Sequence, residues 1–153
     1  MKNREKRGDE GAVMVEFLAA FLPIFAFFLG LVQLVFIQTA SLIVNHAAHV
    51  AVRAAVVVIP DDALGSVGSA QGAKKAEIER AARIPLSTLG LDGGDVNVDL
   101  DRASYSTNQT VTVTVSVDYT CRVPLGGLMA CGGAQTTLTG RASMPNQGAN
   151  FVY

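Results

Sequence analysis

Glu16 is the one ionisable side chain inside a long apolar stretch of this sequence, and placing its charge in a membrane would cost free energy. The 21 residues that follow it, Phe17 to Ile37, carry no charge and one strongly polar side chain, Gln33. A carboxylate at the centre of a bilayer costs about 2.5–3.5 kcal/mol on insertion scales. If the stretch enters a membrane, Glu16 therefore needs the aqueous edge, a favourable helix dipole or a cation.

Cys121 and Cys131 are the two cysteines of the chain, and they lie close together near its C-terminus. Their spacing is not that of a Cys-x-x-Cys redox or zinc pair. If this part of the chain lies outside the cytoplasm, we expect a disulfide between them. Closing a loop of this size stabilises a fold by roughly 3 kcal/mol in the chain-entropy model.

Two other groups of side chains have atoms that bind metals but lack the pattern of a metal site. His46 and His49 are three residues apart, and a zinc site needs two or three further ligands. The aspartates of residues 92–101 match no EF-hand loop, so a polar turn entering a strand is the simpler interpretation; they are Asp92, Asp95, Asp99 and Asp101. We therefore expect no metal and no cofactor.

Composition and motifs also argue against catalysis and against nucleic-acid binding. The chain has 153 residues and a formal net charge of −1. After Arg7 its basic residues are neither clustered nor interleaved with aromatic residues, as a nucleic-acid surface would require. No glycine-rich phosphate loop follows a predicted strand, and no Gly-x-Ser-x-Gly occurs. We expect neither an enzyme nor a nucleic-acid-binding protein.

The apolar stretch has the length of a membrane-spanning helix. At 1.5 Å per residue, residues 17–37 form a helix about 30 Å long, which matches the hydrocarbon core. Basic residues precede the stretch and the next one is Arg53, so the positive-inside rule places the N-terminus in the cytoplasm. The preceding basic residues are Lys2, Arg4, Lys6 and Arg7.

Three interpretations of this segment are open. A cleaved secretory signal conflicts with an apolar stretch longer than the usual 7–15 residues, and with Gln38, which stands where that cleavage site needs a small residue. An uncleaved signal anchor explains the length and the orientation but not Glu16. The third interpretation uses Gly11 and Glu16 together.

Gly11, followed by Ala12-Val13-Met14-Val15 and then Glu16-Phe17, resembles a class III prepilin signal. In that family a membrane-embedded prepilin peptidase cuts after the glycine on the cytoplasmic side, and the apolar run stays on the mature protein. The resemblance implies cleavage between Gly11 and Ala12, which makes Glu16 the fifth mature residue. It also implies that the new α-amine of Ala12 pairs with the Glu16 carboxylate of a neighbouring subunit and sets the register between helices.

The longer stretch GAVMVEFLAAF…HVAVRAA is similar to the start of TadE/TadG-like pseudopilins, which are minor pilins of the tight-adherence (Tad/Flp) pilus. The similarity covers about residues 7–58 and, loosely, 110–146. It implies a subunit of a pilus or related secretion fibre, held in the bacterial inner membrane with its C-terminal part outside. The implied partners are prepilin peptidase, other pilin or pseudopilin subunits, the inner-membrane assembly platform and membrane lipid. The residues expected to supply helix contacts are Phe17, Leu22, Phe25 and Leu29.

Two alternatives to a pilin remain. One is an uncleaved single-pass envelope anchor or binding protein, and the other is a small β-rich protein released by signal peptidase. The three possibilities differ in the first residue of the mature chain, which is Ala12 for the pilin, Met1 for the anchor and a residue near Ser41 for the secreted protein.

Beyond Ile37 the pattern becomes amphipathic, which predicts that the helix continues to about Ile59 and stops at Pro60. We expect Pro23 to bend this helix near Ala19–Phe21. The predicted polar stripe is Gln38, Ser41, Asn45, His49 and Arg53, and the predicted apolar face is Ile43, Ala47, Val50, Ala54 and Val58.

The remainder predicts a loop over 60–72 and a short helix over 73–84, which Pro85 ends. Alternation of apolar and polar residues predicts strands over 96–100 and 111–119, and a weaker one over 134–144. Three antiparallel strands with one buried face would pack on the long helix.

The expected fold class is therefore α+β, with a long N-terminal helix followed by a small antiparallel β-rich domain with a short helix. We divide the chain into a cytoplasmic leader (1–11), the long helix (12–59) and an extracytoplasmic α+β domain (60–153). Within the helix, the membrane span covers about 17–37 and the amphipathic extension 38–59.

Overall fold

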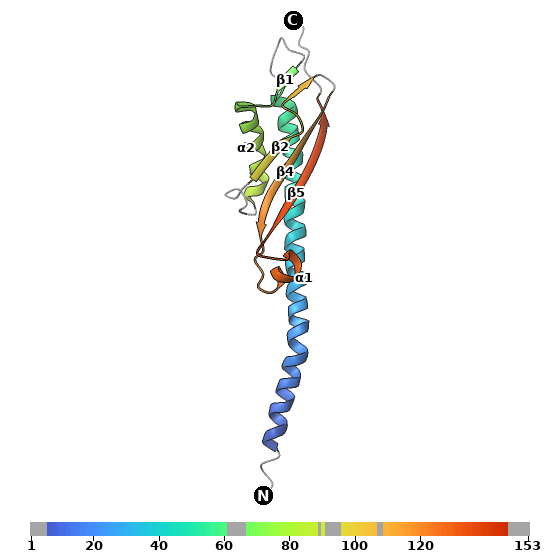
Figure 1. Ribbon diagram of the computed structural model, residues 1–153, viewed down its shortest axis with the longest axis vertical. Helices are drawn as coiled ribbons and strands as arrows, with labels where there is room; N and C mark the ends of the chain where they lie inside the picture. Colours follow the sequence, from blue (N-terminus) through green and yellow to red (C-terminus); the bar gives the residue numbers. More distant parts are fainter. Residues whose placement is uncertain (1–5, 61–66, 89, 91–95, 107–108, 147–153) are drawn as a thin grey trace.

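The computed structural model describes residues 6–60, 67–88, 90, 96–106 and 109–146, with the backbone alone for 6–10 and 67. One helix of 53 residues, α1 (Lys6–Val58), runs the length of the molecule (Figure 1). The described residues from 67 to 146 form a small head, which lies along the C-terminal half of α1. This arrangement confirms the α+β class. The other elements are β1 (Val67–Ser69), α2 (Ala73–Ser87), β2 (Val96–Leu100), β3 (Ser104–Ser106), β4 (Thr110–Thr120), α3 (Gly126–Cys131) and β5 (Gln135–Pro145).

Helix α1 is continuous through Pro23 and ends where the sequence predicts. The Ile59 N–H donates to the Ala55 carbonyl at 2.9 Å, which completes the last turn. The ammonium group of Lys74 donates to the Ile59 carbonyl at 3.2 Å. A cation there satisfies an otherwise open carbonyl and complements the negative end of the helix dipole.

Strands β2, β4 and β5 form an antiparallel sheet with β4 in the middle. The alternation along β4 places its valines and Tyr119 on a buried face and its polar residues on the other face. All three strands expected from alternation are therefore confirmed. Helix α1 packs on β4 and β5, while α2 packs against α1 and β2.

Small residues let α1 and the sheet approach closely. A Cβ atom on Gly140 of β5 would lie 2.6 Å from the Val44 carbonyl oxygen of α1, closer than real Cβ contacts allow. The face of α1 that meets the head is rich in alanine and fully buried; it consists of Ala40, Val44, Ala47, Ala48, Ala51, Val52, Ala55 and Ile59. The core of the head is therefore completed by α1.

The predicted apolar face of the extension is wrong in part. Of its five residues only Ala47 is fully buried, and Ile43, Val50, Ala54 and Val58 are half-buried. The alanines sit at the centre of the interface because they permit the closest packing, and the larger side chains fill its flanks. The polar stripe is exposed as expected at Gln38, Asn45, His49 and Arg53, and Ser41 is half-buried.

Helix α2 is longer than predicted, because it continues through Pro85 to Ser87. Proline removes one helical hydrogen bond, but burial of Leu86 extends the apolar face of Ile78 and Ala82 by another turn. The hydroxyl of Thr88 donates to the Pro85 carbonyl at 2.8 Å and closes the end. Packing of Leu86 thus outweighs the tendency of Pro85 to end the helix.

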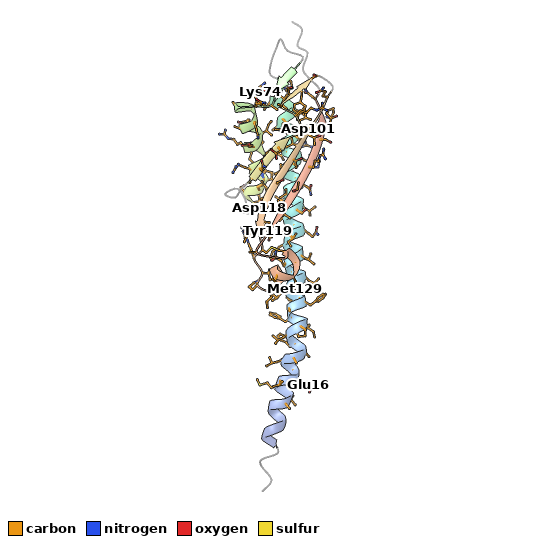
Figure 2. The ribbon with its side chains drawn as sticks, viewed as in Figure 1. Glu16, Lys74, Asp101, Asp118, Tyr119 and Met129 are labelled. Atoms are coloured by element: carbon orange, nitrogen blue, oxygen red, sulfur yellow. A yellow bond between two sulfur atoms is a disulfide. The ribbon has the colours of Figure 1, made fainter. Side chains whose placement is uncertain are left out.

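Two short strands, β1 and β3, pair beside the head and were not predicted. Tyr105 of β3 is fully buried, and its hydroxyl donates to Asp101 Oδ1 at 2.6 Å and accepts from the Arg102 N–H at 3.1 Å. The same Asp101 oxygen accepts from the Thr112 N–H at 3.0 Å. Asp101 therefore joins three parts of the head, at the end of the head distant from α3 (Figure 2).

Burial, followed by the hydrogen bond to Asp101, raises the pKa of Tyr105 from 10.0 to about 12. The fold favours the neutral phenol, so this contribution to stability is complete below pH 10 and is lost as the pH rises through about 12. We predict that the free energy of unfolding falls more steeply over this window in the wild type than in Tyr105→Phe. Tyr105→Phe should also cost about 1 kcal/mol at neutral pH. Denaturant unfolding of both proteins from pH 8 upward measures the difference, and parallel pH profiles would contradict the assignment.

Candidate functional site: the uncovered segment of α1

The N-terminal half of α1 projects beyond the head as an exposed apolar helix (Figure 1). Within the described residues, α1 is the one helix long and apolar enough to cross a membrane, and only 6% of its most apolar window is buried. We call residues 12–28 the uncovered segment. Its large exposed side chains are Val13, Met14, Val15, Phe17, Leu18, Phe21, Leu22, Ile24, Phe25, Phe27 and Phe28.

Glu16 lies on the uncovered segment, far below the head (Figure 2). Among the described residues it forms no ion pair within the chain. The next basic residue along the sequence, Arg53, is 37 positions away on the same helix, about 55 Å at 1.5 Å per residue. A cation for Glu16 therefore has to come from the N-terminal region of the chain, from solvent or from another molecule.

Three phenylalanines form a ladder on the uncovered segment. The ring centroids of Phe17 and Phe21 are 5.6 Å apart, and those of Phe21 and Phe25 are 5.5 Å apart, with the rings close to parallel. Of the residues expected to supply helix contacts, Phe17, Leu22 and Phe25 are exposed, and Leu29 is half-covered. The exposed ones present apolar area that is available to lipid or to another helix.

The Gly11–Ala12 peptide bond lies inside α1, which begins at Lys6. Gly11 is exposed, and a Cβ atom placed on it would meet nothing within 4 Å. Glycine costs a helix about 1 kcal/mol relative to alanine, so the helix is locally weakened at this bond.

Helix α3 covers α1 just above the uncovered segment, within the predicted span of 17–37. A Cβ atom on Gly126 would lie 2.5 Å from the Leu29 carbonyl oxygen and 3.1 Å from the Gln33 Cβ, so the two backbones meet closely. The junction of α3 with α1 is thus built on a glycine that no larger residue can replace without movement.

Gln33, the single strongly polar residue of the predicted span, is fully buried at this junction. Its Oε1 accepts from the Val123 N–H at 3.0 Å, and its Nε2 lies 3.8 Å from Cys131 Sγ as a donor. The structure joins Cys121 and Cys131 in a disulfide, with Cα atoms 6.7 Å apart. The amide and the disulfide together fasten the α3 loop to the side of α1.

Sequence reasoning did not find α3 or the role of Gln33. The signal available was a run without charge between Arg122 and Arg141 that contains Leu125, Leu128 and Met129. A lone glutamine in an apolar helix was a second signal, because a buried amide needs hydrogen-bond partners.

The candidate metal ligands do not converge. Within the part of the chain that the structure describes, no three His, Cys, Asp or Glu side chains form a group able to hold a metal. His46 and His49 are exposed on α1. Asp99 accepts a hydrogen bond from Asn97 and Asp101 serves Tyr105 and Thr112. Asp92 and Asp95 lie outside the described residues.

We predict that Gln33→Leu loosens the α3 loop. The substitution leaves the partly buried Val123 N–H without its acceptor, which costs about 1 kcal/mol. Amide hydrogen exchange at Val123 and through α3 should accelerate, while exchange in β4 stays slow. Gln38→Leu is the matched control, because Gln38 is exposed on the same helix. Equal exchange in the two variants would contradict a role for Gln33 as the anchor.

No family model, no curated protein and no solved structure matches the chain. The function proposed below is therefore inferred from the residues and their geometry.

Proposed function

We propose that this chain is a TadE/TadG-like pseudopilin, cut by prepilin peptidase after Gly11 and built into a Tad pilus or a related secretion fibre. The observation that carries this proposal is the uncovered segment beneath a folded head. It is a long apolar helix bearing one carboxylate that forms no ion pair with the residues whose side chains the structure describes. Its work is assembly through helix packing, not catalysis. The proposed location is the bacterial inner membrane, with the N-terminus in the cytoplasm and the head outside.

The physics of Glu16 supports assembly. Two opposite charges attract far more strongly in a low-dielectric bundle of helices than in water. A single charge in that bundle without its partner is strongly unfavourable. If cleavage creates an α-amine on Ala12, one axial offset between neighbouring helices brings that amine to Glu16. The ladder of Phe17, Phe21 and Phe25 then packs against the neighbour at the same offset.

The proposed partners are those that the resemblance to pseudopilins implies. Prepilin peptidase would act on the Gly11–Ala12 bond, and membrane lipid would cover the uncovered segment before assembly. Other pilin or pseudopilin subunits, brought together by the inner-membrane assembly platform, would cover it afterwards.

A second candidate is an uncleaved single-pass envelope anchor. The observation in its favour is that α1 passes without interruption from Lys6 through Gly11 into the apolar stretch. In that case lipid alone covers the uncovered segment, and Glu16 lies at the cytoplasmic edge of the bilayer.

We predict that the mature chain recovered from the envelope begins at Ala12, and that Gly11→Val abolishes this processing. A side chain at Gly11 meets nothing within 4 Å, so the variant should fold and insert normally and fail only as a peptidase substrate. Gly8→Val, which changes another leader glycine, is the control and should be cut as in the wild type. Intact-mass spectrometry reads the mature terminus. A chain beginning at Met1 in cells with an active peptidase would support the anchor instead.

We predict that Glu16→Gln permits membrane insertion and processing yet reduces incorporation into fibres at least tenfold, because the amide keeps the shape and loses the charge. The double variant Glu16→Ala, Ala20→Glu keeps a carboxylate on the uncovered segment but moves it one turn, about 6 Å. It should also fail to assemble if the charge sets the register. Fibre yield relative to membrane-inserted protein measures both. Normal fibres from either variant would contradict the role of Glu16.

A further inference from the structure

Helix α3 presents large apolar side chains to the outside of the molecule. Leu125, Leu128 and Met129 are 61%, 73% and 63% exposed. Figure 2 shows Met129 beside α1, at the end of the head nearest the uncovered segment. A groove of about 160 Å³ lies between the two helices; it is lined by Phe27, Gly30, Leu31, Leu34, Met129 and Ala130. The apolar surface of α3 is thus continuous with that of α1.

The level of α3 along α1 places it at the depth of a bilayer's edge. Helix α3 packs on Leu29 and Gln33. At 1.5 Å per residue these positions lie about 18 and 24 Å along the helix from Phe17, or about 26 and 32 Å from Ala12. The hydrocarbon core is about 30 Å thick. Whether the core begins at Ala12 or at Phe17, α3 lies in the leaflet nearest the head or at its boundary.

The chemistry of the loop agrees with that depth. The sequence carries no charge between Arg122 and Arg141, and none on α1 between Glu16 and Arg53. The charged residue nearest α3 in the sequence is Arg122, which is exposed beside Cys121. Asp118 lies above Met129 on β4, where it accepts from the Thr137 hydroxyl at 2.7 Å (Figure 2). Uncharged surface at this level faces lipid without the cost of burying an ion.

Backbone groups of the loop are also satisfied from within the protein, as a lipid environment requires. Gln33 accepts from the Val123 N–H, and the Val123 carbonyl accepts from the Gly127 N–H at 2.9 Å. The Leu125 carbonyl accepts from the Met129 N–H at 3.3 Å, and the Ala134 carbonyl accepts from the Cys121 N–H at 2.9 Å.

Leu125 has a backbone conformation that bulky residues rarely adopt, with φ of 61°. A glycine would adopt it without strain. The leucine nevertheless stands there with its side chain outside the core, which is understandable if that side chain has apolar surroundings outside the protein.

We propose that α3 and the uncharged part of its disulfide-closed loop, residues 123–131, are embedded among the lipids of the leaflet nearest the head and fix the distance between head and bilayer. This inference rests on α1 crossing the membrane, which belongs to the proposed function, but not on cleavage or on fibre assembly. The occupant of the α3 surface is the acyl-chain and headgroup boundary of lipid, because the surface continues that of the membrane helix at the same level.

The experiment uses the absence of tryptophan from the chain. Leu128→Trp places one fluorophore on exposed α3, Ile24→Trp places one within the uncovered segment, and Ile84→Trp places one on exposed α2 of the head. Each full-length variant is reconstituted in phosphatidylcholine vesicles, with or without lipids brominated near the headgroup or deep in the acyl chain. Tryptophan emission and its quenching by bromine report the surroundings and the depth.

We expect Leu128→Trp to emit at short wavelength and to lose intensity to bromines near the headgroup as strongly as Ile24→Trp does to deep ones. Ile84→Trp should remain unquenched. If Ile24→Trp is quenched and Leu128→Trp is not, the inference is overturned while the membrane span stands. Blue-shifted but unquenched Leu128→Trp would show a second copy covering α3, which also overturns it. If no variant is quenched, α1 does not cross the bilayer, and the proposed function fails with the inference.

Discussion

The physical constraint on which this structure depends is that the head covers α1 along only part of its length. From Ala40 to Ile59, α1 has a fully buried face beneath the sheet and α2. From Val13 to Phe28, its phenylalanines, leucines and valines are exposed. Apolar area of this extent is not stable in water, since each Å² exposed costs about 25 cal/mol. We propose that lipid or other chains cover this area.

The head and the helix are one folding unit. The sheet has one apolar face, built from the valines of β4 and the small residues of β5, and α1 is what covers it. The close approach at Gly140 and the alanine face of α1 leave no room for a different partner. The α3 loop adds a second attachment through Gln33 and the Cys121–Cys131 disulfide.

The features that could be predicted from the sequence are those that depend on the spacing of apolar residues. Alternation located β2, β4 and β5, and the apolar run with Pro60 located the course and end of α1. It failed where tertiary contacts decide: burial of Leu86 carries α2 past Pro85, and close packing selects alanines over Ile43 and Val50 for the buried face. Helix α3 is too short to show a periodic pattern of apolar residues. Gln33 accepts its hydrogen bond from Val123, which is 90 residues away in the sequence. The roles of Gly11, Ala12 and Glu16 depend on other molecules and stay predictions.

We propose above all that the Glu16 carboxylate, which forms no ion pair with the described side chains of its own chain, pairs with the Ala12 amine of an adjoining chain. Fibres assembled from a mixture of isotopically heavy and light protein, treated with a zero-length carbodiimide, test this contact directly. We predict an amide bond between the Ala12 amine and Glu16 in peptides that join one heavy and one light chain. Heavy–light peptides linked through other residues, with Glu16 unmodified in intact fibres, would contradict it.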